Sequence, residues 1–334
     1  MTVSSSFLSH NEAFDRVIGA NPTLELIAEN EAYPFAHEAG VYVPLSNTWF
    51  ITSNRFTNSE TGQQESHNNK SVVGRCRQGG YGNMRGDKHH SNRDPMAIGG
   101  INYRGGILIC AQGSMNSPSS LYHMSSQPPY STTLMKSDFY GRSFNSVNNV
   151  VIHSDGSIWF TDPIYGFEQG YRPASRLPNQ IYRFNPADGS IRATADGFGR
   201  PNFSPDEKQI HVTDTDWIHG DGTTNNTRAS SIYAFEVTVY HNQPFLTGRR
   251  LFAMADTTIP DGIKCDPAGN VYSGCGDGVN VWSPGGVLLC RILVEGGVAN
   301  FCWGRDGEMF LMNEHRLYRA KLTGEDTKGA VIGV

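Results

Sequence analysis

Three residues with oxygen-bearing side chains, Glu38, Asn148 and Asp261, stand at corresponding places in repeated segments of this chain. Asn148 lies fourteen residues before Asp162, at the start of a short strand–turn–strand unit. Asp261 lies fourteen residues before the matching end of its own unit and Glu38 fifteen, with the extra residue assigned to a longer turn. Hard divalent cations such as Ca²⁺ prefer carboxylate and amide oxygens. If the units are equivalent in space, these side chains could hold such an ion.

The units that carry these residues are predicted strand pairs, each an apolar strand, a polar turn and a second apolar strand. Further strand candidates lie between the units, and no convincing helix follows the N-terminal segment. This pattern predicts an all-β fold, a six-bladed β-propeller of four-stranded blades with a central channel, rather than a pair of β-sandwiches. The six units begin at Phe144 and, in the other repeats, at Glu38, Ile101, Asn202, Asp261 and Asn300.

The whole chain, 1–334, is expected to form one propeller domain. Residues 1–33 form a lead-in segment that could also supply the closing strand of the last blade, since pairing the termini removes exposed sheet edges. Segment 54–95 is too polar for a full set of blade strands and too long for an ordinary connection. It is expected to be a surface loop or a lid over the channel, with Arg85 and His90 as substrate contacts if it is a lid.

The first strand of every propeller blade lines the channel, so the side chains at the strand starts should converge at one end of it. Two carboxylates balance the charge of a divalent ion, and no thiol occupies an equivalent place, which disfavours soft metals. The competing interpretation is that Asn, Asp and Glu at strand starts only hydrogen-bond a turn. Three such residues at one register in different units favour the site.

Several motifs resemble the SMP-30/gluconolactonase/LRE-like family, and its fungal gluconolactonase-like members in particular. They are HEAGVYVP, FNSVNNVVIHSDGSIWFTDPIYG, RPNFSPDEKQIHVTDT and PDGIKCDPAGNVYSGCGDGVNVWSP, in the expected order, and the resemblance covers roughly residues 35–322. The resemblance implies a six-bladed propeller that hydrolyses sugar lactones or other lactones. It also implies one divalent cation in the channel, held by a Glu, two Asn and an Asp.

Carried over residue by residue, the ligands that the resemblance implies are Glu38, Asn148, Asn202 and Asp261, and the family tends to use that Asp as general base. Two departures affect this assignment. Asn149 stands where the family usually has Asp, and three residues are missing after Asn202, which shortens its strand. Because each strand residue spans about 3.3 Å, the amide of Asn202 could fall short of the ligand position.

This leaves three alternatives for the expected cation site. The cation has three protein ligands plus water, or Arg200 or Asn202 has another role, or the site has been lost. Calcium is the expected ion, with zinc, magnesium and manganese as the other candidates.

Other polar residues are weaker candidates. Asn149 and Asn300 are expected to contact substrate at the channel mouth, although bonding to a turn is an equal alternative for Asn300. His37 precedes Glu38 and would point to the opposite face of a strand, so core packing is favoured over catalysis. Glu314 and His315 follow a second strand and are expected to be structural.

Composition excludes some classes of function. A net charge of −5 offers no basic surface for nucleic acid, and no apolar run is long enough to span a membrane. The six cysteines form no CxxC pair, and the start of the chain does not resemble a secretory signal, so buried free thiols in the cytoplasm are expected.

The sequence therefore predicts a metal-dependent lactone hydrolase with a small-molecule, lactone-like substrate and no nucleic-acid or membrane partner. The cation would polarise the lactone carbonyl, and Asp261 would take a proton from the attacking water. Two alternatives remain open at this point: a cyclase or isomerase with a modified metal site, and a non-catalytic calcium-binding protein.

Overall fold

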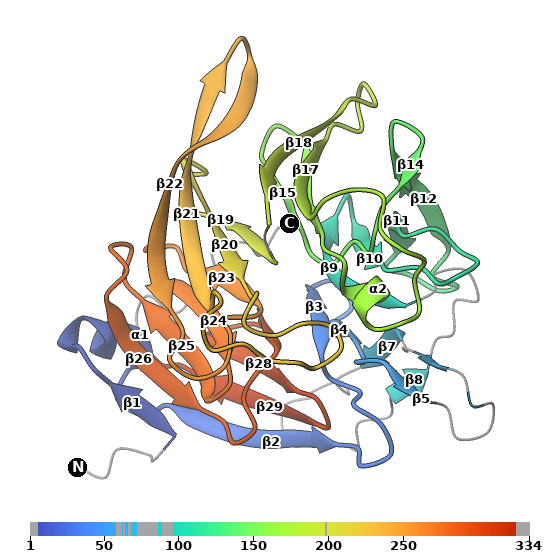
Figure 1. Ribbon diagram of the computed structural model, residues 1–334. Helices are drawn as coiled ribbons and strands as arrows, with labels where there is room; N and C mark the ends of the chain where they lie inside the picture. Colours follow the sequence, from blue (N-terminus) through green and yellow to red (C-terminus); the bar gives the residue numbers. More distant parts are fainter. Residues whose placement is uncertain are drawn as a thin grey trace.

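The computed structural model describes residues 6–57, 62, 64–65, 68–71, 86–88, 96–197 and 199–324. The described residues form antiparallel sheets arranged in a ring (Figure 1), which confirms the predicted all-β propeller fold. Helices in the described residues are short, and none is long and apolar enough to cross a membrane. They are η1 (Glu12–Phe14), α1 (Asp15–Ile18) and α2 (Tyr165–Glu168).

The first three sheets follow one another along the chain, each with its first strand innermost and later strands added outward. We number the blades by the chain order of these innermost strands. Blade 1 comprises β3 (Glu38–Val43), β4 (Thr48–Thr52), β7 (Asn68–Ser71) and β8 (Gly86–Lys88); blade 2 comprises β9 (Ala97–Tyr103), β10 (Gly106–Ala111), β11 (Ser120–Ser125) and β12 (Thr132–Lys136); blade 3 comprises β15 (Val150–Ile152), β16 (Ile158–Asp162), β17 (Gln180–Phe184) and β18 (Ile191–Asp196).

The last three sheets have the same order of strands, and two of them also include a strand from the N-terminus. Blade 4 comprises β19 (Pro201–Phe203), β20 (Gln209–Asp214), β21 (Ser231–Tyr240) and β22 (Gln243–Met254); blade 5 comprises β23 (Ile263–Cys265), β24 (Val271–Cys275), β25 (Gly278–Trp282), β26 (Leu288–Leu293) and β1 (Phe7–Ser9); blade 6 comprises β27 (Asn300–Trp303), β28 (Glu308–Asn313), β29 (Arg316–Lys321) and β2 (Thr23–Glu29).

The N-terminal segment closes the ring. Strand β2 pairs with β29 and completes blade 6, as predicted for the lead-in segment. Strand β1 pairs with β26, so blade 5 has five strands. The other five blades have four strands each, as predicted. Both pairings cover sheet edges that would otherwise be exposed.

Segment 54–95 contributes more to the fold than its polarity predicted. Strands β7 and β8 form the outer half of blade 1, and a short ribbon pairs β5 (Phe56–Thr57) with β6 (Gln64–Glu65). The segment thus supplies two blade strands and not a full set, and outer strands of this kind need little apolar sequence. Arg85 and His90 lie outside the described residues. A second ribbon pairs β13 (Asp138–Phe139) with β14 (Arg142–Ser143).

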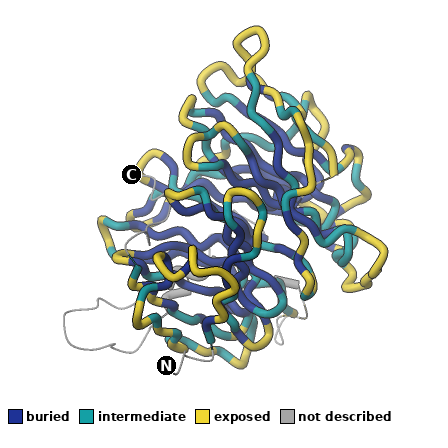
Figure 2. Tube along the Cα trace, turned by 90° about the vertical axis from the view of Figure 1, so that its left-hand side faces the viewer, coloured by how far each residue is buried: buried dark blue, intermediate teal, exposed yellow. Residues whose placement is uncertain are grey.

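The core lies between neighbouring blades. The second strands β4, β10, β16 and β24 are buried along their whole length, which explains their continuous apolar sequence. Figure 2 shows this buried interior, with exposed residues concentrated in the loops and hairpin tips. Five cysteines are free and buried, as predicted, and the sixth, Cys76, lies outside the described residues.

Candidate functional site

Backbone hydrogen bonds define two levels at the end of the channel where the innermost strands begin. At the first level, one residue in each blade except blade 2 donates its N–H to the second strand of the same blade. We call these residues the outer level and the residues that follow them the inner level. The outer level is His37, Asn148, Gly199, Asp261 and Ala299. The inner level is Glu38, Asn149, Arg200, Gly262 and Asn300.

The levels show which of the predicted ligands occupy equivalent positions in their blades. Asn148 and Asp261 share the outer level, in agreement with their equal spacing in the sequence. Glu38 lies one level deeper, because blade 1 has, besides its longer turn, a further residue in a bulge between Ala39 and Val41. Ala39 adopts φ of 63° at this bulge, a conformation that the sequence pattern does not reveal.

Asn202 does not join the other predicted ligands. It pairs with His211 in β20, three residues beyond Gly199, which takes the outer level in blade 4. Its side-chain Nδ2 donates to the carbonyl of Phe203 at 2.9 Å. The three missing residues have therefore moved the amide down the channel and left a glycine at the level of Asn148.

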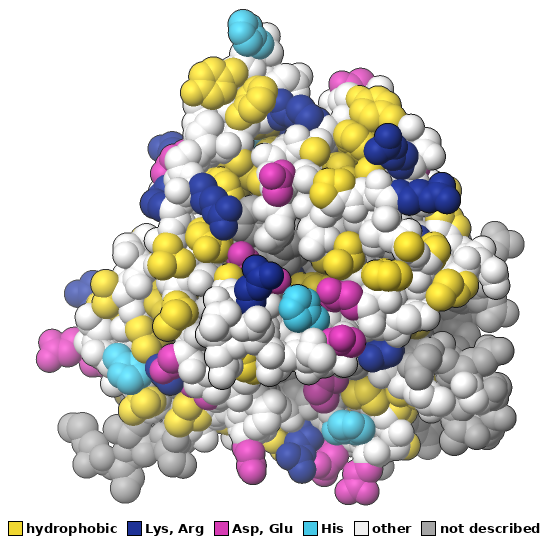
Figure 3. All heavy atoms as spheres, viewed as in Figure 1, with side chains coloured by type: hydrophobic (Ala, Val, Ile, Leu, Met, Phe, Trp, Pro, Cys, Tyr) yellow, Lys and Arg dark blue, Asp and Glu magenta, His cyan; other side chains and the backbone are white. Residues whose placement is uncertain are grey.

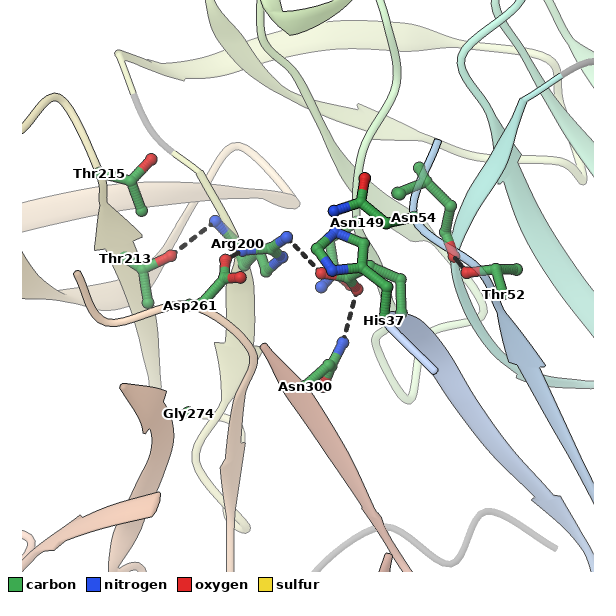
Figure 4. A network of polar contacts seen from close by, with 12 residues as sticks. His37, Thr52, Asn54, Asn149, Arg200, Thr213, Thr215, Asp261, Gly274 and Asn300 are labelled. Carbon is green, nitrogen blue, oxygen red and sulfur yellow. Dashed lines mark hydrogen bonds and ion pairs between the residues drawn. The ribbon is translucent and has the colours of Figure 1, made fainter. Parts of the chain in front are cut away.

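Arg200 forms the centre of a buried polar cluster instead. Its guanidinium makes ion pairs with Glu38 and with Asp261 (Figure 4). Asn300 donates from Nδ2 to the second oxygen of Glu38 at 2.7 Å. The Glu38 side chain is fully buried, and that of Arg200 is 7% exposed. The cluster thus joins side chains from blades 1, 4, 5 and 6.

Local backbone contacts hold this cluster in place. The N–H of Arg200 donates to Thr213 Oγ1 at 3.0 Å, which fixes the start of β19. Asn300 Oδ1 accepts the N–H of Phe301 at 2.8 Å, so its Nδ2 is directed at Glu38. A Cβ atom at Gly262 would come within 2.4 Å of Asn300 Oδ1. The glycine after Asp261 is therefore needed to make room for the amide.

A histidine–glutamate pair lies beside the cluster. His37 Nδ1 is 2.6 Å from Glu314 Oε1, and Asn54 donates to the other oxygen of Glu314 at 3.2 Å. Burial lowers the pKa of His37, but the negative charges of Glu314 and Glu38 outweigh this effect and raise its pKa above 6.5. Figure 4 shows His37 beside the contact between Arg200 and Glu38.

The sequence interpretation of His37 and Glu314 as purely structural missed this pair. The signal that could have revealed His37 is its place immediately before Glu38, at the same strand start. Glu314 could not be found this way, because it follows the end of β28 and is far from His37 in the sequence. An isolated β-bridge between Glu314 and Ala36 brings it to the site. His315 is bonded to the Asn30 carbonyl at 2.8 Å, in a structural role of the kind expected for it.

Two cavities are lined by chain neighbours of the cluster residues. The central channel, about 270 Å³, is lined by innermost strands of all six blades, including Asn149 and Asn202. A second pocket of about 250 Å³ is lined by Gly199, Tyr165 and His219, among others. Gly199 lines this pocket and Pro201 lines the channel, so Arg200 lies between them in the chain. Charged and histidine side chains gather near the middle of the face shown in Figure 3.

The described residues do not fit a divalent cation in this arrangement. Both oxygens of Glu38 accept N–H groups, from Arg200 and Asn300, and Asp261 is paired with Arg200. Asn148 Oδ1 is buried and has no hydrogen-bond partner in the described part of the chain. A calcium ion takes six to eight oxygens. No group of three or more His, Cys, Asp or Glu among the described residues is arranged to bind a metal.

A β-propeller with a buried polar cluster at the mouth of its channel is an architecture suited to small-molecule chemistry. Residues 59–313 match the sequence profile described as the SMP-30/Gluconolactonase/LRE-like region. The chain belongs to this family, which confirms the resemblance drawn from its motifs.

Individual relatives agree with this assignment. The chain is 27% identical to a lactonohydrolase of Aspergillus oryzae over 91% of this chain and 76% of the relative. It is 26% identical to a gluconolactonase of Zymomonas mobilis over 55% of this chain and 52% of that protein. The structure of a gluconolactonase from Xanthomonas campestris has a TM-score of 0.69, with 23% identity and 95% of each chain covered. At this identity, the structural likeness shows the shared fold.

Proposed function

We propose that this protein hydrolyses a small lactone at the channel mouth. Family membership and relatives named lactonohydrolase and gluconolactonase support this reaction class. The observation that carries the proposal is the buried cluster of Arg200, Glu38, Asp261 and Asn300 beside a pocket of about 250 Å³. A pocket of this size suits a compact lactone rather than a polymer.

The reaction needs a positive group for the carbonyl oxygen and a base for water. The water oxygen attacks the carbonyl carbon while the base takes one proton, and the carbonyl oxygen becomes an oxyanion. When this intermediate collapses, the ring C–O bond breaks, and the proton passes from the base to the departing ring oxygen. The product is a hydroxy acid. A fixed charge stabilises the oxyanion most when it is preorganised in a site that excludes water.

Two side chains at the site could serve as the base. Asp261, the base expected from the sequence, is engaged by Arg200, so its Oδ1 is not available to water in this arrangement. His37 is held at Nδ1 by Glu314, and its Nε2 has no bond to any described residue. A base oriented by a carboxylate through its other ring nitrogen is a recurring arrangement in hydrolases. We therefore assign proton transfer to His37.

The test is a panel of five- and six-membered lactones, with acid release followed at constant pH. The wild-type protein should hydrolyse at least one of them. The His37→Asn variant should have a much lower kcat and a nearly unchanged KM. The control is His315→Asn, which removes a histidine whose Nδ1 is bonded to the Asn30 carbonyl.

A wild-type protein that hydrolyses none of the lactones would contradict the proposed function. A protein that is active, but is disabled by Asp261→Asn and unaffected by His37→Asn, would keep the function and move the base to Asp261.

A further inference from the structure

The start of blade 4 differs chemically from the starts of blades 3 and 5. Blades 3 and 5 place Asn148 and Asp261 at the outer level, whereas blade 4 places Gly199 there and Arg200 at the inner level. We propose that the Arg200 guanidinium takes the place of a divalent cation in this protein. Lactone hydrolysis here would then be independent of metal. The catalytic part of this inference rests on the proposed function, and the exclusion of metal does not.

The position of the guanidinium supports this inference. Glu38 and Asp261 come from blades 1 and 5, and both are directed at the same arginine from blade 4. Arginine presents five N–H groups in a rigid planar fork and stays protonated, so it can bind two carboxylates at once. A lysine would offer only a point charge. The carboxylates that would hold a cation are thus cross-linked by a positive side chain of the protein itself.

The loss of the blade 4 ligand supports it independently. Gly199 has no side chain to offer at the level of Asn148 and Asp261, and Asn202 is three residues deeper with its amide bonded to Phe203. A cation would therefore have to displace Arg200 from two buried ion pairs and would gain no oxygen from blade 4. Displacement would also leave the guanidinium buried without its carboxylates, which is strongly unfavourable.

The charge at the site changes as a consequence. Two carboxylates and one guanidinium sum to −1, whereas two carboxylates and a divalent cation sum to zero. Remaining N–H groups of Arg200 would donate to the lactone carbonyl and then to the oxyanion, in the role that a Lewis acid has in metal hydrolases. Arg200 Nε is buried and has no partner among the described residues, so the guanidinium keeps one unused donor.

The experiment measures metal content and thermal stability in three proteins: the wild type, Arg200→Ala, and the double variant Gly199→Asn with Arg200→Gly. The double variant restores an amide at the outer level and removes the guanidinium. Each protein is dialysed against calcium chloride, and then against zinc chloride, before metal analysis. Tm is recorded with calcium and with a chelator. The wild type should retain far less than one ion per chain and should show the same Tm in both conditions.

The double variant should retain about one calcium ion per chain, with a Tm about 2 °C or more higher in calcium than in chelator. The matched control is Arg291→Ala, because Arg291 also bridges two carboxylates, Asp256 and Asp277, at 2.9 Å each. This control should gain no calcium, which separates a built site from simple removal of a positive charge.

Two results would overturn the inference. One is a wild-type protein that holds about one calcium or zinc ion per chain, whose Tm then falls in chelator. The other is a failure of both Arg200→Ala and the double variant to bind any cation while each remains folded by circular dichroism. If the metal results are as expected and no lactone is hydrolysed, the proposed function fails and the exclusion of metal stands.

Discussion

Arg200 and Arg291 each bind two carboxylates, but one partner of Arg291 is exposed to solvent. The partners of Arg200 come from blades 1 and 5, and the Glu38 side chain is fully buried. The partners of Arg291 flank strands of blade 5, and Asp256 is 56% exposed. Exposed ion pairs contribute about 0–1 kcal/mol, whereas breaking a buried pair costs about 3–5 kcal/mol. The comparison shows that breaking an ion pair of the channel cluster destabilises the protein more than breaking an exposed pair does, because the tertiary structure buries the channel charges.

Replacing the most buried partner should have the largest effect. Glu38→Gln keeps the shape of the side chain but removes the charge that faces Arg200 and Asn300. We expect a loss of about 3 kcal/mol in the free energy of unfolding, because a buried guanidinium loses one of its two carboxylates. Urea unfolding measures this loss. Asp256→Asn, which breaks the exposed ion pair of Arg291, should cost about 1 kcal/mol or less. Equal losses in the two variants would contradict the comparison.

The next effect concerns catalysis rather than stability. His37→Gln should lower kcat about 100-fold, the usual contribution of a positioned base, with little change in KM. The measurement is steady-state hydrolysis of the best lactone found. Glu314→Gln removes the carboxylate that orients Nδ1 and should lower kcat by less, because the imidazole itself remains. A larger loss in Glu314→Gln than in His37→Gln would mean that the carboxylate, not the histidine, takes the proton.

A third prediction concerns a titratable group buried in the wall of blade 4. Burial lowers the pKa of His211 from 6.5 to about 4, so the folded protein favours its neutral form. This contribution to stability is fully present above pH 6.5 and is lost as the pH falls toward 4. Between pH 7 and pH 5 it should fall by about 2 kcal/mol.

The measurement for His211 is the difference between wild type and His211→Gln, by urea unfolding at both pH values. Asp162 acts in the opposite direction, because burial raises its pKa to about 7, and subtracting the variant removes that effect. A difference between the two proteins that does not change with pH would show that His211 does not titrate in this range.

The smallest effect should distinguish two asparagines of the channel. Asn300 donates to the buried carboxylate of Glu38, whereas Asn202 donates to the neutral carbonyl of Phe203. Hydrogen bonds to charged groups contribute about 1.5–3 kcal/mol and neutral ones about 1 kcal/mol. Asn300→Ala should therefore destabilise the protein by about 1 kcal/mol more than Asn202→Ala, as measured by urea unfolding. Activity should fall in the first variant and stay within about threefold of wild type in the second. A larger loss of stability and activity in Asn202→Ala than in Asn300→Ala would show that Asn202 belongs to the functional site.

Part of the candidate site could be predicted because the repeat has a fixed length. Equal spacing placed Asn148 and Asp261 together, and the structure has them at one level. The same reasoning misplaced Glu38 by one residue, since a bulge adds a residue without changing the apolar pattern. It could not place Asn202, because counting residues does not tell whether a deletion shortens a turn or shifts a strand.

The sequence by itself determined the all-β propeller and the family. Apolar strand pairs, turn residues and the order of motifs can be read directly from the sequence, and the structure has them where they were predicted. It also placed Asn148 and Asp261 at corresponding starts of innermost strands. Only the tertiary structure decided what those residues do, because Arg200 meets Glu38 across 162 positions of chain and Asn300 meets Glu38 across 262. Charges that distant in sequence carry no periodic signal, and only closure of the ring brings them within hydrogen-bond distance.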